Sequence, residues 1–136
     1  MAKALEVEMS DFFGRQYNEA WQFDGDEIAR FYCVPTVTVR GDGSIHCLQS
    51  REELARFFQG VLDTYKGQGL ASTTLHDLRV VPIGDRSALV SMTWNAVDAD
   101  GRPIREWRQS YNLVRLADGW RILVSTFHLS AAHSRP

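Results

Sequence analysis

The sequence predicts an α+β fold in which a strongly curved, mostly antiparallel sheet of four long strands and a short hairpin wraps around three N-terminal helices. Apolar residues recur at helical spacing before Gly69, and their period changes to two after it. Only short turns of Gly and Asp separate the later strands, so these should pair as a meander. A curved sheet closed by helices forms a cone, and its wide end is a natural place for an internal pocket.

Three helices are expected in the first half of the chain. The segment Lys3–Gln22 carries apolar residues at steps of three and four, which places them on one helix face. Asp24 can cap a second, short helix that carries Tyr32 and ends before Pro35. Ser50 opens a capping box for the third helix, which has the clearest pattern of the three.

Strand patterns fill the rest of the chain. A short hairpin, Thr36–Arg40 with Ser44–Leu48, separates the second and third helices. The four long strands are expected at about Ala71–Val81, Ser87–Val97, Ile104–Leu116 and Trp120–Leu129. Strands of ten residues or so exceed the usual five or six, so they must twist and curl. We expect one domain over residues 1–136, with its core at about 10–129.

The composition of the chain limits the classes of binding partner to be expected. The 136 residues carry a net charge of −2, which indicates neither a nucleic-acid nor an anionic-membrane partner. No apolar run approaches the roughly 18 residues of a membrane span. Acidic residues interrupt the start of the chain where a signal peptide would be apolar, and two cysteines make no disulfide framework. We therefore expect a cytoplasmic protein. Scattered histidines and the lack of phosphate or dinucleotide motifs predict no metal and no cofactor.

The last hairpin is apolar on both of its faces. Period two puts Trp120, Ile122 and His128 on one face of the final strand, and Leu123 and Phe127 on the other. Helices can cover only one side of a sheet, and an apolar outer side usually needs a partner. We expect a homodimer through the convex sheet face. The alternative is a central strand that is buried on both sides within one monomer.

The order of elements and three segments resemble a known superfamily. The segments are "AWQFDGDEIARFYCVPTVTVRGDG", "SREELARFF" and "DGWRILVSTFH". The chain from Ser10 to His128 resembles the nuclear-transport-factor-two-like superfamily, in particular its SnoaL-like branch. The resemblance implies a cone-shaped α+β fold that is commonly dimeric. The superfamily includes ketosteroid isomerases, polyketide cyclases, dehydratases, epoxide hydrolases and members without enzymatic activity, so the fold alone does not select a function.

Position-by-position comparison with ketosteroid isomerase-like members gives a mixed match. Tyr17 and Trp21 resemble their phenol and the apolar residue four positions later. Those enzymes place a carboxylate base near the end of the first strand, where this chain has Arg40, with Asp42 two residues further on. Their second acid lies on a main-sheet strand, and the only acidic residue in the corresponding strand here is Glu106.

Period two suggests which polar side chains could face the cone. If Glu106 and Arg108 face inward, Glu106 or Asp42 could act as acid/base, Tyr17 as hydrogen-bond donor and Arg108 as anion stabiliser. The candidate ligand-binding residues are Trp21, His46, Asn95, Arg108, Ser110 and His128. Five of these residues also have a structural interpretation: Tyr17 and Trp21 as helix core, Glu106 and Arg108 as paired with each other or with solvent at a sheet edge, and His128 as a hydrogen-bonded core histidine.

Two functions are compatible with these patterns. The first is a pocket protein that binds a small, largely apolar, cyclic molecule. The alternative is a cofactor-free isomerase, cyclase or dehydratase that acts by general acid/base proton transfer.

Overall fold

The computed structural model describes residues 2–129. Its helical elements are α1 (Ala2–Asp11), η1 (Phe12–Tyr17), α2 (Asn18–Ala20), α3 (Gly25–Ala29) and α4 (Arg51–Gly67). Its strands are β1 (Tyr32–Val39), β2 (Ile45–Leu48), β3 (Ser72–Ile83), β4 (Ser87–Val97), β5 (Pro103–Leu116) and β6 (Gly119–Phe127). This succession of helices, short hairpin and four long strands confirms the expected α+β class.

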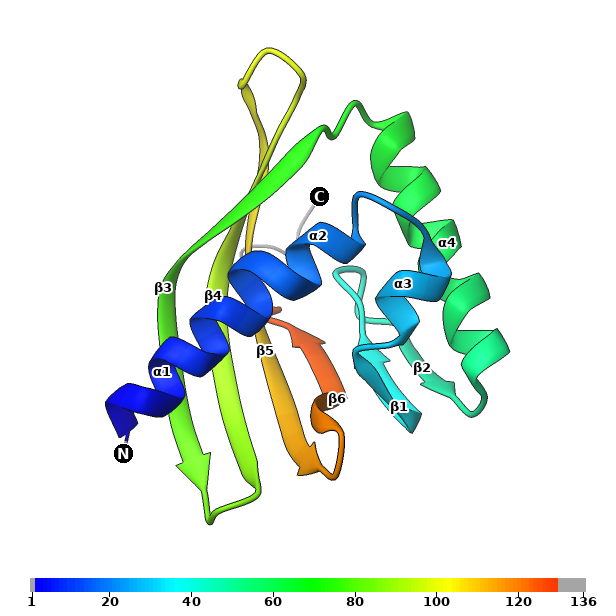
Figure 1. Ribbon diagram of the computed structural model, residues 1–136. Coiled ribbons are helices and arrows are strands. Elements are labelled where there is room, and N and C mark those ends of the chain that lie inside the picture. The colour runs from blue at the N-terminus through cyan, green and yellow to red at the C-terminus, as the bar shows by residue number, and fades with distance from the viewer. Residues whose placement is uncertain (1, 130–136) are drawn as a thin grey trace.

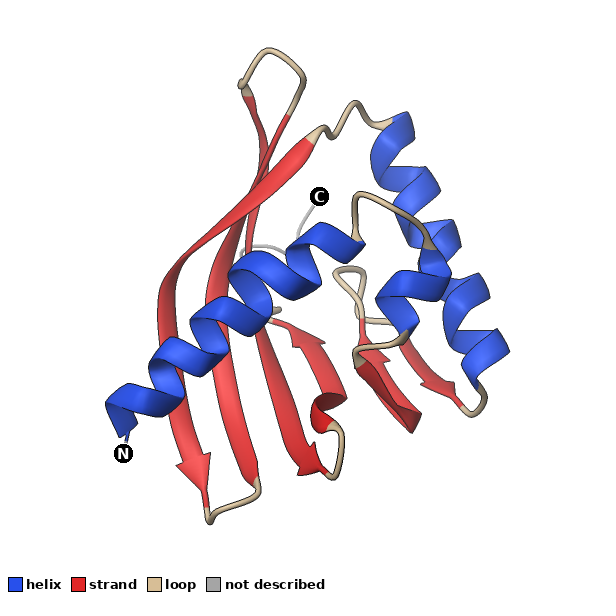
Figure 2. Cartoon of the chain, viewed as in Figure 1, coloured by secondary structure: helices blue, strands red, loops and turns tan. Residues whose placement is uncertain are grey.

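One curved sheet contains all six strands, in the order β2-β1-β6-β5-β4-β3. The four long strands form an antiparallel meander, as their short turns predict. The β1–β2 hairpin joins the sheet beside β6, and β1 runs parallel to β6. Figure 2 shows the strands curling around the helices, which cover one face of the sheet. The mostly antiparallel sheet of the expected cone is therefore confirmed.

The first three helical elements form a continuous rod that crosses the long strands (Figure 1). The rod contains a π-helical turn at Phe12–Tyr17. Phe12, Phe13 and Tyr17 are all buried within this turn. A π turn widens the helix and often occurs at functional sites. Here it carries Tyr17 into the interior of the cone.

Side-chain caps begin the other two helices. The Asp24 carboxylate accepts a hydrogen bond from the Glu27 backbone N–H at 3.0 Å, and the Ser50 hydroxyl accepts one from the Glu53 N–H at 3.1 Å. The short helix ends at Ala29, so the expectation that it carries Tyr32 is wrong. Tyr32 instead begins β1, where it pairs with β6. Long-range pairing thus overrides the local helical pattern.

A β-bulge interrupts the last strand. Ile122 pairs with Leu113 and Val124 pairs with Asn112, so Leu123 is an extra residue in β6. The bulge reverses the side-chain phase: Trp120 and Ile122 are buried before it, and Ser125 and Phe127 after it. The strict period-two assignment is therefore wrong, because His128 does not share the inner face of Trp120. Apolar residues occupy both sequence faces partly because the inner face changes parity at Leu123.

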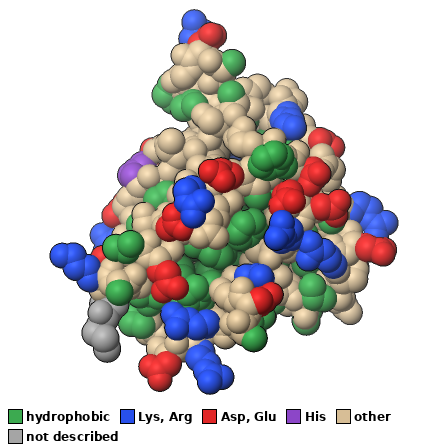
Figure 3. Space-filling view, in the orientation of Figure 1, with side chains coloured by type: hydrophobic (Ala, Val, Ile, Leu, Met, Phe, Trp, Pro, Cys, Tyr) green, Lys and Arg blue, Asp and Glu red, His purple; other side chains and the backbone are tan. Residues whose placement is uncertain are grey.

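The core lies between the helices and the concave face of the sheet. Its fully buried side chains come from every layer: Met9, Phe13, Ile28, Leu54, Phe58, Met92, Tyr111, Leu113 and Ile122. Figure 3 shows hydrophobic side chains gathered at the centre of this view and ringed by charged ones. Burying this much apolar surface drives the closure of the cone.

One buried hydroxyl is hydrogen-bonded to the bulge. The Thr36 Oγ1–H donates to the Leu123 carbonyl oxygen at 2.6 Å, and Thr36 is buried. We predict that Thr36→Val, which keeps the shape and removes the donor, lowers the free energy of unfolding by about 1–2 kcal/mol in urea titrations.

Thr126→Val is the matched control for that substitution. Within residues 2–129 the Thr126 hydroxyl makes no hydrogen bond, so its loss should change stability by no more than about 0.5 kcal/mol. Equal stability of Thr36→Val and the native protein would contradict the role given to this bond.

Candidate functional site

An internal cavity lies between the end of the helix rod, α4 and the inner face of the sheet. Its volume is about 70 Å³, which holds a few water molecules and is smaller than the roughly 150 Å³ of an engineered cavity that binds benzene. Sixteen residues line it: Tyr17, Asn18, Trp21, Gln22, Arg40, Leu62, Tyr65, Lys66, Leu70, Ala71, Thr73, Trp94, Trp107, Gln109, Tyr111 and Phe127. Seven of these residues are aromatic, so the lining is suited to flat apolar molecules.

A wider groove of about 410 Å³ lies next to this cavity. Arg40, Tyr65 and Phe127 line both spaces. These three residues form the wall that the two spaces share. A ligand that is too large for the inner cavity could extend into the groove through this shared wall.

The aromatic side chains of the cavity support one another. The Trp107 ring is stacked on Phe127 at a centroid distance of 5.9 Å and an angle of 9°. The Trp21 ring stacks on Tyr65 at 5.9 Å. Offset aromatic pairs of this kind are favourable beyond their buried area. The walls of the cavity are consequently ordered by contacts that do not require a ligand.

Two buried phenols are hydrogen-bonded to each other at the cavity. The hydroxyls of Tyr17 and Tyr32 are 2.6 Å apart, and Tyr17 lines the cavity whereas Tyr32 does not. Burial raises the pKa of Tyr17 to about 12, and burial also raises the pKa of Tyr32 well above its usual value. Tyr17 is therefore a neutral phenol near pH 7, and with Tyr32 as its donor it can direct its own proton into the cavity.

Most other polar groups of the lining already have partners. Gln109 Nε2–H donates to Ser125 Oγ at 2.6 Å, while Gln109 Oε1 accepts from the Trp107 indole N–H at 2.9 Å. Asn18 Nδ2–H donates to the Thr73 carbonyl, and its Oδ1 accepts from the Thr73 hydroxyl at 2.7 Å. These pairs fix side-chain positions and leave few groups free to hold a ligand.

Arg40 is the exception among the half-buried polar groups. It follows β1, and its guanidinium lies 4.8 Å from the Phe127 ring centroid. Its hydrogen bonds to Thr38 Oγ1 and the Tyr65 hydroxyl are long, at 3.3 and 3.5 Å. Within residues 2–129 Arg40 makes no ion pair. A cation held against an aromatic ring at the cavity wall remains available for an anion.

The cavity lacks several of the groups used in acid/base catalysis, although phenols and the amine of Lys66 are present in its lining. Its sixteen lining residues include no carboxylate, imidazole or thiol. The described part of the chain also contains no group of three or more His, Cys, Asp or Glu side chains placed to hold a metal ion. The available chemistry is apolar contact, hydrogen bonding from a neutral phenol, and charge pairing through arginine.

The structure places the candidates from the first half of the chain in different environments. Tyr17 and Trp21 both line the cavity. Asp42 lies in the turn after β1 and lines only the outer groove. Its carboxylate accepts hydrogen bonds from the Ser44 hydroxyl and N–H, which lower the pKa of Asp42, whereas an acid/base group near neutrality needs a raised value. His46 lies outside the cavity, hydrogen-bonded to Ser44 at 3.0 Å and 4.9 Å from the Phe57 ring.

The candidates from the long strands lie on the opposite face of the sheet, so their expected placement in the cone is corrected. In β5 the residues that point inward are Trp107, Gln109, Tyr111 and Leu113. Strand alternation therefore sends Glu106, Arg108 and Ser110 to the convex face. Asn95 faces outward for the same reason beside the buried Trp94, and the β6 bulge sends His128 outward.

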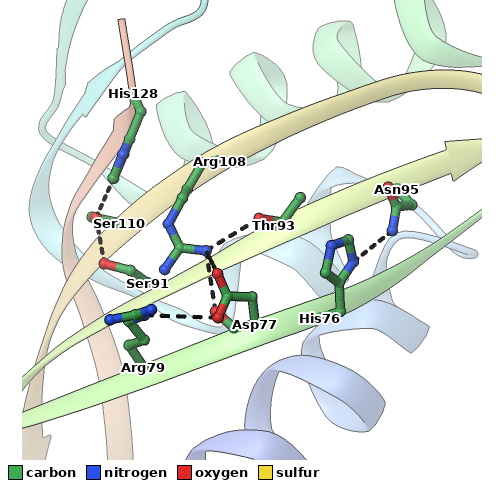
Figure 4. Close-up of polar contacts among 9 residues, drawn as sticks. All are labelled: His76, Asp77, Arg79, Ser91, Thr93, Asn95, Arg108, Ser110 and His128. Carbon is green, nitrogen blue, oxygen red and sulfur yellow. Dashed lines mark hydrogen bonds and ion pairs between the residues drawn. The ribbon is translucent and has the colours of Figure 1, made fainter.

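On the convex face Asn95, Arg108, Ser110 and His128 belong to a set of polar contacts, here called the polar network (Figure 4), whereas the Glu106 side chain makes no polar contact within residues 2–129. Arg108 donates to Asp77 at 3.3 Å and to Thr93 Oγ1 at 3.1 Å. A second chain of contacts links His128 to Ser110 at 2.6 Å, and Ser110 to Ser91 at 2.6 Å. A third contact, at 2.7 Å, joins Asn95 to the ring of His76. This network stabilises the outer surface of the sheet and has no contact with the cavity.

Sequence reasoning missed Trp94, Trp107, Tyr111 and Arg40 as cavity residues. The polar candidates from the long strands belong to the outer face, whereas the polar strand residues that line the cavity, Thr73 and Gln109, were not among them. The sequence pattern that indicates the inward face of β5 is at its odd-numbered positions, where Trp107, Tyr111 and Leu113 recur with period two. In a ligand cavity dominated by aromatic rings, the apolar face of a strand identifies the site better than the polar one.

A curved sheet wrapped around a helix rod, with a cavity at its wide end, defines a cone-shaped NTF2-like protein. The family model described as "NTF2-like protein (DUF6841)" matches residues 6–130, and the chain belongs to this family. The resemblance to the nuclear-transport-factor-two-like superfamily is thereby confirmed. Among curated protein sequences, none is detectably similar to this chain.

Solved structures with the same fold are only distantly related in sequence. The protein Aln2 from a Streptomyces species is 17% identical, with a TM-score of 0.72 over 92% of this chain and 90% of that one. A Nostoc punctiforme domain of unknown function with a cystatin-like fold is 21% identical, with a TM-score of 0.69 over 93% and 79%. An NTF2-like superfamily protein from Salmonella enterica is 19% identical, with a TM-score of 0.65 over 96% and 94%. At these identities the similarity establishes the fold alone.

The buried phenols predict a specific dependence of stability on pH. The unfolded chain loses its tyrosine protons near pH 10, whereas folded Tyr17, whose pKa is raised, keeps its proton until about pH 12. Stability is therefore complete below about pH 10 and falls as pH rises toward 12, by about 1.4 kcal/mol per pH unit for each such phenol.

Urea titrations with absorbance at 295 nm between pH 9 and 12 test this dependence. Tyr17→Phe should make the alkaline loss of stability shallower. Reversible ionisation of all four tyrosines near pH 10 without unfolding would contradict the burial of Tyr17, Tyr32 and Tyr111.

Proposed function

We propose that this protein is a binding module that holds a small, largely apolar, cyclic molecule in its aromatic cavity without transforming it. The observation that carries the proposal is the composition of the lining: seven aromatic side chains, the neutral phenol of Tyr17 among them, and no carboxylate or imidazole. Flat apolar molecules gain from contact with such rings. Proton transfer to or from a carbon atom requires a positioned base, and the lining contains no carboxylate or imidazole for that role.

The cavity size limits the ligand. A volume of about 70 Å³ admits at most a few non-hydrogen atoms without movement. A single ring therefore needs the shared wall of Tyr65 and Phe127 to shift toward the groove of about 410 Å³. One- and two-ring molecules fit this combined space better than larger polycyclic ones.

The alternative function, a cofactor-free isomerase, cyclase or dehydratase, has one favourable feature. The Tyr17–Tyr32 hydroxyl pair, with its oxygens 2.6 Å apart, could stabilise a developing oxyanion. The matching base is missing, because Arg40 occupies that wall of the cavity and Asp42 is bound to Ser44. We therefore favour binding over catalysis.

Binding is tested by titrating the protein with one- and two-ring aromatic compounds and measuring affinity by calorimetry. Trp21→Ala, which removes a cavity wall, should weaken binding about tenfold, the effect of losing one aromatic contact. Phe23→Ala is the matched control, because the Phe23 side chain is 66% exposed and does not line the cavity.

Two further substitutions separate binding from acid/base catalysis. Asp42→Asn and Glu106→Gln should leave the affinity for uncharged compounds unchanged, because neither carboxylate lines the inner cavity. A turnover of any bound compound that either substitution abolishes, with folding intact, would overturn the non-catalytic proposal.

We further propose a homodimer through the convex sheet face. Val81 and Leu89 are directly paired on β3 and β4, and their side chains are 56% and 44% exposed. Together with the exposed Ile83 they form an apolar patch beside the polar network of Figure 4. A partner that buries this patch would remove apolar surface from water.

The dimer prediction is tested by sedimentation velocity. Leu89→Glu should convert the dimer to a monomer, because it puts a charge into the patch. Val7→Glu, at a residue of α1 that is 67% exposed, should leave the dimer intact. A native protein that sediments as a monomer at micromolar concentration would refute the dimer.

No helix within residues 2–129 is long and apolar enough to cross a membrane. Cytoplasmic location stays a prediction from the sequence.

A further inference from the structure

The cavity and its adjoining groove carry a charge opposite to that of the whole protein. The chain has a net charge of −2. The residues lining the two spaces include three cations, Arg40, Lys66 and Arg105, but only one carboxylate, that of Asp42. A concave site of one sign concentrates ligands of the opposite sign. The site is therefore electrostatically suited to an anion although the protein as a whole is acidic.

Arg40 and Arg105 approach the shared wall from two different strands. Arg40 follows β1, and its guanidinium lies 4.8 Å from the Phe127 ring centroid. Arg105 extends from β5, with its guanidinium 5.6 Å from the Tyr65 ring and 5.5 Å from the Trp107 ring. A Cβ built on Gly41, the residue after Arg40, would lie 3.9 Å from Arg105 Nη2 and 3.3 Å from Phe127. Both guanidinium groups thus lie at the wall that separates the cavity from the groove.

Neither guanidinium is neutralised by the protein. In the part of the chain that the structure describes, Arg40 and Arg105 take part in no ion pair, whereas Arg15, Arg30, Arg79, Arg108, Arg115 and Arg121 do. The carboxylate of Asp42 lies in the same groove but is bound to the Ser44 hydroxyl at 2.6 Å and to the Ser44 N–H at 2.9 Å. Aromatic rings hold the two arginines in place, and the hydrogen bonds of Arg40 to Thr38 and Tyr65 are long, at 3.3 and 3.5 Å, so a carboxylate can compete for these N–H groups.

We propose that the ligand is an aromatic carboxylate, with its ring among the cavity aromatics and its carboxylate at Arg40 and Arg105. This proposal rests on the binding function proposed above and specifies the ligand class. A guanidinium is planar and its paired N–H groups match the two oxygens of a carboxylate. A carboxylate joined directly to a ring is itself flat, so it continues the stacked arrangement of Trp107 and Phe127.

The test compares each acid with its uncharged amide. The probes are benzoate against benzamide and 2-naphthoate against 2-naphthamide, measured by calorimetry at low salt. At least one acid should bind the native protein about tenfold or more tightly than its amide, the effect of a charge-assisted hydrogen bond. Raising the salt concentration should weaken the acid and leave the amide unchanged.

Arginine substitutions test whether the two guanidinium groups cause the preference for acid over amide. Arg40→Met and Arg105→Met keep most of the apolar stem, and each should reduce the preference for acid over amide about tenfold. Arg86→Met is the matched control, because Arg86 is exposed and lines neither space. If circular dichroism shows that Arg40→Met does not fold, two measurements still test the proposal. They are the acid preference of Arg105→Met, at an exposed residue, and the salt dependence of acid binding to the native protein.

The outcomes separate the two proposals. Equal affinity for acid and amide, or a preference that survives both arginine substitutions, would overturn the anionic ligand and leave the aromatic binding function standing. Failure of all four probes to bind would overturn both. A preference for acid that Arg40→Met and Arg105→Met remove and Arg86→Met does not would establish the carboxylate site.

Discussion

The extra residue at Leu123 is the constraint on which the arrangement of the cavity depends. Because Leu123 is inserted between two regular pairs with β5, the second half of β6 presents Ser125 and Phe127 inward. Phe127 then stacks on Trp107 and supports Arg40, while Ser125 accepts the hydrogen bond that orients Gln109. Without the bulge, Thr126 and His128 would occupy the inner face, and the cavity would have a polar imidazole in place of an aromatic wall.

The hydrogen bonds among polar side chains at the cavity wall explain why this cavity is suited to binding. Asn18 with Thr73, and Gln109 with Ser125 and Trp107, satisfy one another's hydrogen bonds. Their role is to hold the aromatic rings at fixed positions, which lowers the entropic cost of forming a complex. The polar chemistry left for a ligand is concentrated at two ends, with the Tyr17 phenol at the inner end and the Arg40 guanidinium at the shared wall. A molecule with a ring and one anionic group matches this separation.

The sequence was sufficient for the fold because the fold follows from local patterns. The capping residues Asp24 and Ser50, the change of period at Gly69 and the short turns between the long strands all act over a few residues. The inner half of the site could also be predicted from the sequence, since Tyr17 and Trp21 belong to the apolar stripe of a helix.

The rest of the site depended on strand phase, which local patterns do not determine. Both parities of β5 carry large or polar side chains, and choosing the polar parity placed Glu106, Arg108 and Ser110 in the cone instead of Trp107 and Tyr111. The bulge that turns His128 outward arises from pairing among β1, β5 and β6, with Thr36 bound to the carbonyl of the bulged residue. Such a long-range hydrogen bond, between residues 87 positions apart, leaves no local signature.

Nuclear magnetic resonance of the tryptophan indole N–H groups tests the central claim most directly. The chain has four tryptophans: Trp21, Trp94 and Trp107 line the cavity, whereas Trp120 is bound to Glu8 away from it. Adding benzoate should shift the three cavity signals and leave the Trp120 signal in place. Unchanged cavity signals, or a shift confined to Trp120, would contradict the account of this aromatic cavity as the ligand site.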